Sequence, residues 1–175
     1  MKLKTCSVLL LSFLVLSAQL LAFDGQRKGF ILGGGIGAGS IHYEEPGWAG
    51  FNKGAFVTNF KIGYAPSNSL EIYYINSVDW FSYYSESLIM GTTGVGVTKY
   101  LNPKGNGFFV FGAVGISFFQ NTTYSNGHTG FGFIGGAGYD IAKHWSIQGD
   151  VMYTDVESGA AKSWAFRATL NFLAF

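Results

Sequence analysis

Three histidines are the residues of this chain with the clearest chemical potential, because an imidazole ring can bind a metal ion or transfer a proton near neutral pH. They are His42, His128 and His144. A zinc site needs histidine, cysteine or carboxylate ligands at short, regular spacing, and no such grouping accompanies the three. The sequence therefore predicts no metal site and no cofactor, and we interpret these histidines as solvated side chains of loops and turns.

A glycine-rich run at residues 33–39 is similar to a loose dinucleotide-binding fingerprint. That fingerprint holds a pyrophosphate only where a helix follows the glycines. Here Phe30-Ile31-Leu32 precedes the run and Ser40-Ile41-His42 follows it, so the run lies inside a strand pattern. We expect a sharply curved strand in which alternate glycines leave space for large side chains of neighbouring strands.

The elements that would position these residues are eight segments of alternating hydrophobicity, each about ten residues or a little longer. In the seventh, Trp145, Ile147 and Val151 point to one side, while Asp150 and Met152 point to the other. This period of two predicts an all-β protein, although a soluble β-sandwich also alternates. The segments are roughly Gly29–His42, Lys53–Ala65, Ser69–Trp80, Glu86–Leu101, Phe108–Gln120, Gly130–Ile141, Trp145–Thr154 and Ser163–Phe175.

The connections between these segments alternate between tight and mostly longer ones. Bacterial barrels have short periplasmic turns and longer outer loops, so the alternation favours a membrane barrel. The tight connections are Pro66–Ser69, Asn102–Gly107 and Ala142–His144. The predicted outer loops are Tyr43–Asn52, Phe81–Ser85, Asn121–Thr129 and Asp155–Lys162.

The first 22 residues have the three regions of an export signal. A basic start, Met1–Lys4, precedes an apolar stretch from Val8 to Leu16, and small residues follow up to Ala22. The apolar stretch is shorter than the roughly 20 residues of a spanning helix. We predict a signal peptide at 1–22, with Ala18 as an alternative cleavage site, and a single domain at 23–175.

The composition excludes some function classes. Without Lys2 and Lys4, nine basic residues stand against ten acidic ones, which argues against a nucleic-acid binder. Charged residues make up 12% of the chain and aromatic residues 18%. A soluble domain usually carries about twice that charge. The deficit indicates an exterior in contact with lipid.

The chain ends inside an alternating segment, on Phe175. With the export signal and the even strand count, this ending resembles the small bacterial outer-membrane β-barrel superfamily, the OmpX-like and OmpA-transmembrane-domain-like proteins. The resemblance implies an eight-stranded antiparallel up-and-down transmembrane β-barrel, monomeric, in the outer membrane of a Gram-negative bacterium. It implies that outer-membrane lipid surrounds the protein and that Phe175 is part of the signal read by the barrel-assembly machinery. Phe175 departs from the family pattern, because it shares its parity with the polar Arg167 and Asn171.

Aromatic residues near both ends of the segments would form two interfacial girdles. The outer set is Tyr43, Trp48, Trp80, Tyr83, Tyr84, Tyr124, Tyr153 and Trp164, and the set near the turns is Tyr64, Tyr100, Tyr139 and Trp145.

An eight-stranded lumen is just wide enough to be filled by side chains or to hold one small ligand. The side chains predicted to fill it are Glu71, Tyr73, Asp150, Met152 and Arg167. A filled lumen favours a structural or surface-interaction role, with a narrow channel for small hydrophobic solutes as the alternative.

A barrel enzyme that modifies lipid A or phospholipid is a third hypothesis. A nucleophilic serine would need a histidine base and an orienting carboxylate, and Ser125, His128 and Glu157 have these residue types. The outer loop reads Ser125-Asn126-Gly127-His128, which differs from the His-any-Ser order of lipid A deacylases. The sequence therefore favours a polar loop, and we predict no catalytic residue.

The closing hairpin has one register that matches polar with polar and apolar with apolar residues. It places Asp150 opposite Arg167, Val151 opposite Phe166 and Met152 opposite Ala165. A one-residue slip would oppose side chains of unlike character. We therefore predict an ion pair between Asp150 and Arg167 in the lumen, where either charge alone would be costly to bury.

Overall fold

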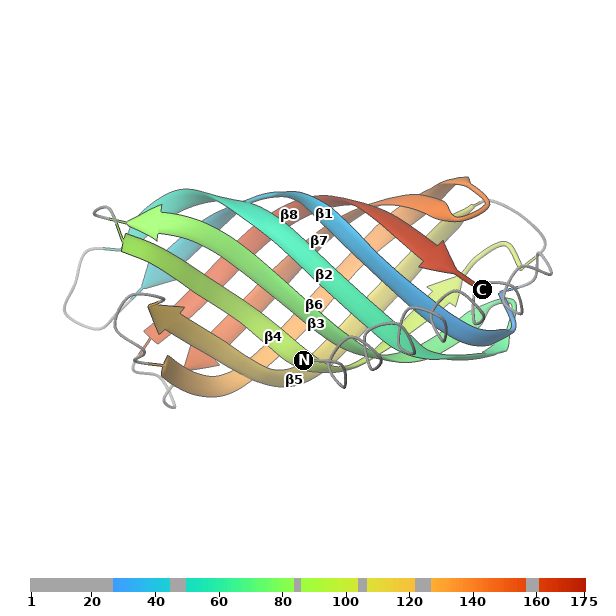
Figure 1. Ribbon diagram of the computed structural model, residues 1–175, viewed down its shortest axis with the longest axis horizontal. Coiled ribbons are helices and arrows are strands. Elements are labelled where there is room, and N and C mark those ends of the chain that lie inside the picture. Colours follow the sequence, from blue (N-terminus) through green and yellow to red (C-terminus); the bar gives the residue numbers. More distant parts are fainter. Residues whose placement is uncertain (1–26, 45–49, 84–85, 104–106, 122–126, 157–160) are drawn as a thin grey trace, which may run out of the picture.

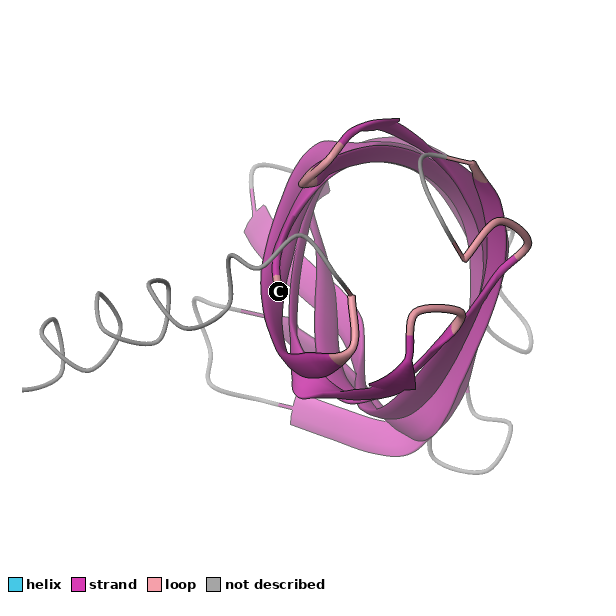
Figure 2. Cartoon of the chain, turned by 90° about the vertical axis from the view of Figure 1, so that its right-hand side faces the viewer, coloured by secondary structure: helices cyan, strands magenta, loops and turns pink. Residues whose placement is uncertain are grey.

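Eight antiparallel strands close into a single barrel in the structure, a computed structural model that describes residues 27–44, 50–83, 86–103, 107–121, 127–156 and 161–175. Each strand pairs with its neighbour in the chain, and β8 closes the barrel against β1 (Figure 1). Figure 2 looks along the barrel, and the strands form a closed ring. The strands are β1 (Gly29–Glu44), β2 (Phe51–Ser67), β3 (Leu70–Tyr83), β4 (Glu86–Tyr100), β5 (Phe108–Asn121), β6 (Gly127–Ala142), β7 (Trp145–Val156) and β8 (Ala161–Ala174).

The predicted eight-stranded barrel is confirmed, and the strand boundaries differ mainly at the ends. The predicted loop Asn121–Thr129 is wrong at its C-terminal end, because β6 begins at Gly127. The first residues of β6 continue the ladder with β5, where His128 pairs with Phe119 and Thr129 with Phe118. Backbone pairing thus extends beyond the apolar part of the strand, where side-chain alternation gives no signal.

The glycine-rich run lies in the middle of strand β1 and not before a helix. A dinucleotide-binding fingerprint needs a helix after the glycines, so the fold excludes that interpretation. The odd-numbered glycines of the run face the lumen beside β8. A Cβ on Gly35 would overlap the side chain of Asn171, and a Cβ on Gly39 would lie 3.0 Å from Cγ of Arg167. The glycines therefore provide the space that large lumen side chains of β8 occupy, as the sequence predicted.

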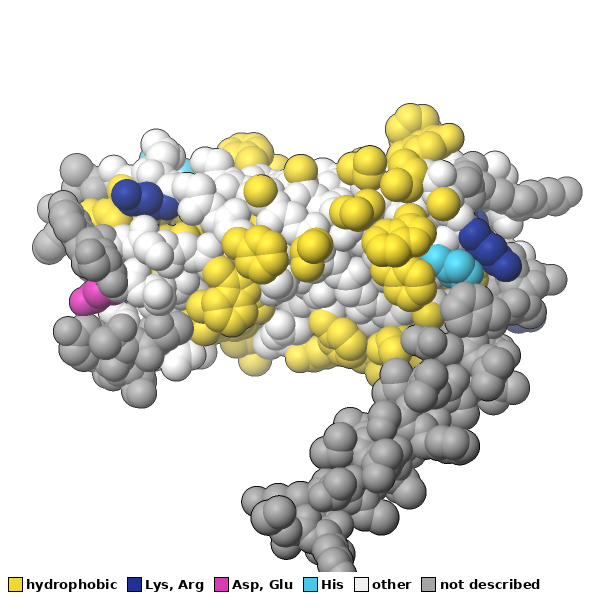
Figure 3. Space-filling view, turned by 45° about the horizontal axis from the view of Figure 1, so that its top comes forward, with side chains coloured by type: hydrophobic (Ala, Val, Ile, Leu, Met, Phe, Trp, Pro, Cys, Tyr) yellow, Lys and Arg dark blue, Asp and Glu magenta, His cyan; other side chains and the backbone are white. Residues whose placement is uncertain are grey.

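The two faces of the barrel differ as the alternation predicted. Large apolar side chains such as Ile36, Val114 and Phe166 are exposed on the outside. Figure 3 shows hydrophobic side chains over much of one face of the barrel. Polar and charged side chains such as Glu71, Asp79 and Arg167 are buried inside. Among the described residues, the outward-facing charged side chains lie only near the two ends of the barrel. This is the polarity of a barrel surrounded by lipid.

The aromatic girdles are only partly as predicted. Trp80, Trp164, Tyr64, Tyr139 and Trp145 are exposed on the outside near the strand ends. Three predicted girdle residues instead have lumen parity, which corrects their assignment: Tyr43, Tyr83 and Tyr100. Another three lie outside the described residues: Trp48, Tyr84 and Tyr124.

The predicted signal peptide, residues 1–22, also lies outside the described residues. Within the described ranges, no helix has the length and apolar character needed to cross a membrane.

Candidate functional site in the barrel lumen

The centre of the lumen is organised around Arg167 on β8. β7 and β8 pair in the register that the sequence suggested, with Asp150 opposite Arg167. The Arg167 Nε donates to Asp150 Oδ1 at 2.6 Å, and a terminal nitrogen of the same guanidinium also contacts that carboxylate. The structure thus places the two predicted lumen residues together as an ion pair.

The opposite wall of the lumen completes this cluster. From β3, Ser77 Oγ accepts a hydrogen bond from an Arg167 terminal nitrogen at 3.0 Å, and Asp79 Oδ1 accepts another at 3.4 Å. One guanidinium therefore faces two buried carboxylates, and a planar group with five donors is suited to this. The second Asp79 oxygen, Oδ2, is buried with no hydrogen-bond partner among the described residues. Asp79 has the same parity on β3 as the predicted lumen residues Glu71 and Tyr73, but alternation along β3 does not show that it meets β8.

A second charged cluster lies nearer the turn end. Lys61 Nζ lies 3.2 Å from Glu71 Oε2, and Tyr100 donates its hydroxyl to Glu71 Oε1 at 2.8 Å. The Lys61 ammonium also lies 4.9 Å from the centre of the Tyr73 ring, and Thr98 donates to the Tyr73 hydroxyl at 3.0 Å. Glu71 is fully buried and has two partners, so its burial is compensated.

A small polar cavity separates the two clusters. Its volume is about 20 Å³, room for about one water molecule. Its lining includes Lys61, Tyr73, Gln148, Asp150 and Arg167, each from a strand of the wall. Both charged clusters thus border the same small space.

Arg27 closes the turn end of the lumen. It precedes β1, and its side chain turns inward to contact Asp140 Oδ2 at 2.5 Å and to stack over the Tyr100 ring at 4.0 Å. One terminal nitrogen also donates to the carbonyl oxygens of Asn68 and Asn102, at 3.4 and 3.3 Å. Arg27 therefore connects two periplasmic-type turns to β6. Sequence reasoning missed it because it lies outside every alternating segment.

The loop end of the lumen is aromatic. Tyr43, Phe51 and Tyr83 form a continuous stack, with ring centres 5.1 Å apart in the first pair and 4.3 Å in the second. The ring centre of Phe119 lies 5.4 Å from that of Tyr43 and 6.4 Å from that of Phe81. Inward parity could have indicated these rings, whereas the position of Tyr43 and Tyr83 near strand ends suggested the membrane interface.

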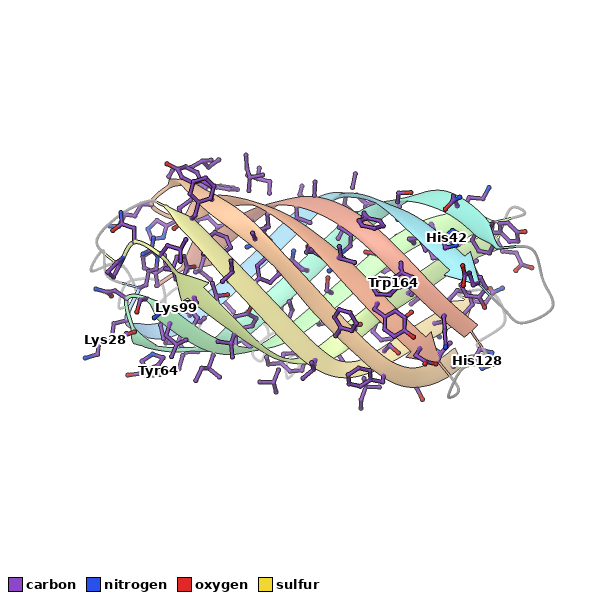
Figure 4. The ribbon with its side chains drawn as sticks, turned by 180° about the vertical axis from the view of Figure 1, so that it is seen from behind. Lys28, His42, Tyr64, Lys99, His128 and Trp164 are labelled. Atoms are coloured by element: carbon purple, nitrogen blue, oxygen red, sulfur yellow. The ribbon has the colours of Figure 1, made fainter. Side chains whose placement is uncertain are left out.

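The candidate chemical residues do not form a reactive centre in the described part of the chain. His42 is exposed, and its Nδ1 and Nε2 each lie 2.8 Å from a partner, Asn52 Oδ1 and Glu44 Oε1. His128 lies exposed on β6 at the same end of the barrel (Figure 4). No group of three potential metal ligands occurs among the described residues. Ser125 and Glu157, the other members of the candidate triad, lie outside those residues.

The interpretation of His144 as a solvated turn residue is wrong in part. His144 lies in the turn between β6 and β7, as predicted, but its Nδ1 donates to the Leu173 carbonyl at 2.8 Å. Its ring packs against Phe175, with ring centres 4.8 Å apart. Phe175 is itself buried, as expected from the parity that it shares with the inward-facing Arg167 and Asn171. The end of β8 is thus held by the neighbouring turn.

Several solved structures share this fold. The attachment invasion locus protein Ail of Yersinia pestis superposes with a TM-score of 0.62 at 13% identity, over 83% of this chain and 99% of that one. Neisserial surface protein A gives 0.56 at 13% identity, over 83% and 97%. The N-terminal barrel domain of OprF from Pseudomonas aeruginosa gives 0.53 at 12% identity, over 84% and 100%. No curated protein matches the chain.

A family model described as the outer membrane protein beta-barrel domain matches residues 8–172. That match covers nearly the whole chain, and it agrees with the closed barrel, the apolar exterior and the polar lumen. The chain therefore belongs to the outer membrane protein β-barrel family and is a protein of the bacterial outer membrane.

Proposed function

We propose that this protein is a closed barrel with a structural or surface-interaction role, in which the strands hold the outer loops as a rigid scaffold. One observation carries the proposal: side chains fill the lumen at three successive levels. Arg27 and Tyr100 occupy the turn end, the Arg167 cluster occupies the centre, and stacked aromatic rings occupy the loop end. Since each level fills a narrow cross-section, a solute would have to displace all three.

Among proteins of this fold, the one from Yersinia pestis is named for attachment and invasion and has been solved with the heparin analogue sucrose octasulfate. At 13% identity that likeness extends to the fold only. It supports the general point that a barrel of this size can present a binding surface. For the present chain, a monomeric barrel surrounded by outer-membrane lipid and assembled through Phe175 is part of the proposal.

Conductance in planar bilayers tests the closed lumen. We expect no stable open steps from the purified barrel, because removing one blockage would still leave two. Arg27→Ala should therefore also remain closed, as should Phe51→Ala at the other end. Stable steps from the unaltered protein would instead support the alternative, a narrow channel for small hydrophobic solutes.

The proposal includes no enzymatic activity. Both ring nitrogens of His42 have partners, Asn52 and Glu44, so neither is available to a serine nucleophile. Mass analysis of lipid A and phospholipids from cells with and without the gene should give identical species. A modification that appears only with the gene would support a lipid-modifying barrel instead.

A further inference from the structure

We propose that the turn between β2 and β3, together with Lys28 and Lys99, forms a binding site for the phosphate of an anionic phospholipid in the periplasmic leaflet of the outer membrane. Short turns of bacterial barrels face the periplasm, which places this turn at that leaflet. The inference is independent of whether the lumen conducts.

The two lysines lie on either side of the same turn. The Lys28 backbone N–H donates to Asn68 Oδ1 at 3.0 Å, and Lys99 Nζ donates to Ser69 Oγ at 3.3 Å. Asn68 and Ser69 are neighbours in the chain, so the two bonds fix both lysines next to one short segment. An ammonium has three donors, and the hydroxyl takes one of those on Lys99.

Arg27 determines where Lys28 points. Its side chain is buried in the lumen, bonded to Asp140 and to the Asn68 carbonyl. Lys28 is the next residue in the chain and, unlike Arg27, it is exposed. The buried Arg27 side chain and the bond from the Lys28 N–H to Asn68 therefore hold the Lys28 backbone at the rim of the barrel, beside the turn.

The depth of the site matches a lipid headgroup. Lys99 pairs with Leu70, two residues closer to the turn than the exposed Val97 and its partner Ile72. Tyr64, which pairs with Ile72 on the other side, is exposed at 55%. Figure 4 shows Lys28, Tyr64 and Lys99 at one end of the barrel, opposite His42 and His128. Tyrosine is enriched at the level of lipid headgroups, so the lysines lie where the phosphates lie.

Charge distinguishes this end from the other. Among the described residues, Lys28, Lys99 and Lys143 are exposed at the turn end, and no acidic side chain there faces outward, because Asp140 is turned into the lumen against Arg27. The loop end carries both signs, as in the pair of Asp155 with Lys162 across β7 and β8. Paired cations without a neighbouring outward carboxylate are complementary to a phosphate.

Native mass spectrometry of the purified barrel with phosphatidylglycerol tests the site. Each lysine near an anionic lipid surface changes the affinity about 5-fold, so Lys28→Gln with Lys99→Gln should weaken retention about 25-fold. Lys143→Gln is the matched control for each single variant, Lys28→Gln or Lys99→Gln, because it removes one charge at the same end but at the turn between β6 and β7. Lys99→Arg should keep the wild-type affinity.

The competing outcomes are separated by the control and by the lipid. Retention by the double variant equal to that of wild type would overturn the proposal. A loss in Lys143→Gln equal to that in Lys28→Gln alone or Lys99→Gln alone would also overturn it, because it would indicate a diffuse charge effect. Equal retention of zwitterionic phosphatidylcholine by wild type would also overturn it, because the site would then not select anionic lipid. Heat-modifiable gel mobility shows that each variant is a folded barrel.

Discussion

Two buried arginines of the lumen differ in how directly the sequence indicates their partners. Arg167 lies in the middle of β8, directly opposite Asp150 on the neighbouring strand. Arg27 lies before the first strand, and its partner Asp140 is 113 residues further along the chain. The first contact follows from matching two adjacent segments, while the second exists only because the closed barrel brings the start of β1 beside the end of β6. Local pairing is readable in a sequence, and closure contacts are not.

Their surroundings also differ. The Arg167 side chain is 2% exposed and faces two carboxylates in the centre of the barrel. The Arg27 side chain is 9% exposed at the mouth, and it contacts one carboxylate, one ring and two backbone carbonyls. Removing Arg167 would leave Asp150 and Asp79 without a counter-charge far from water. Removing Arg27 would leave Asp140 close to solvent, where the charge is more easily hydrated.

The largest effect is therefore expected for Arg167→Ala. Breaking a buried ion pair by removing one partner costs about 3–5 kcal/mol, because an uncompensated charge remains. We expect the free energy of unfolding in lipid bilayers, measured by urea titration, to fall by that amount.

A double-mutant cycle provides the control for Arg167. Asp150→Asn combined with Arg167→Ala should destabilise the barrel less than the sum of the single variants, because the pair is then removed as a unit. Additive effects would contradict the ion pair. They would mean that lumen water hydrates each group independently.

The next largest effect is expected for an arginine placed on the lipid face of the barrel, in contrast to Arg167, which lies in the polar lumen. Val151 is adjacent to Asp150 but points to the lipid, opposite Phe166 on β8. An arginine at the midplane of the lipid face costs about 2–4 kcal/mol, falling to about 0–1 near the interfaces. Val151→Arg should therefore reduce the folded fraction in bilayers much more than Ser82→Arg, an outward position near the loop end. Equal effects would mean that Val151 does not lie at the membrane midplane.

A smaller effect is expected for Arg27→Ala. Hydrogen bonds that involve a charged group contribute about 1.5–3 kcal/mol each, and solvent at the mouth compensates part of the loss. The consequence should be local: amide exchange should accelerate at Tyr100 and Asp140, whose N–H groups bond to Ser69 and Gly107 at the turn end. Exchange at Val151 should not change. Uniform acceleration over the barrel would show that the two arginines have equivalent roles.

The two arginines differ in how far along the chain their partners lie, and this distance decides which contacts the sequence could predict. Alternation predicted the barrel and the facing of the strands, and character matching predicted the β7–β8 register, because both depend on residues close in the chain. Contacts across the lumen, such as Arg167 with Ser77 and Asp79, depend on the curvature and the stagger of all the strands. No local pattern encodes these.

Whether a side chain near a strand end faces the lumen or the lipid is harder to predict, for a different reason. Tyr43 and Tyr100 have the residue type and position of interfacial aromatics, yet both have inward parity. Near a strand end, an aromatic ring is equally suited to the interface and to closing a narrow lumen, so its type does not decide. Parity does decide, but only where the strand continues without a bulge. The register shifts between Asp140 and Ala142, beside the turn, show why parity is harder to apply there.

The smallest effect concerns His144, which belongs to the same class of unpredicted turn-end contacts as Arg27. Its Nδ1 donates to the Leu173 carbonyl, and its own carbonyl accepts from the Leu173 N–H at 2.9 Å, so the turn holds the end of β8 by reciprocal bonds. His144→Ala removes the side-chain bond and the ring contact with Phe175 but keeps the backbone bond. We expect a loss of about 0.5–1.5 kcal/mol in the free energy of unfolding. His42→Ala is the matched control: an exposed histidine at the opposite end should change stability by no more than about 0.5 kcal/mol. If both variants were neutral, the His144 side chain would add nothing to stability, and the backbone bond from the Leu173 N–H would suffice to hold the end of β8 to this turn.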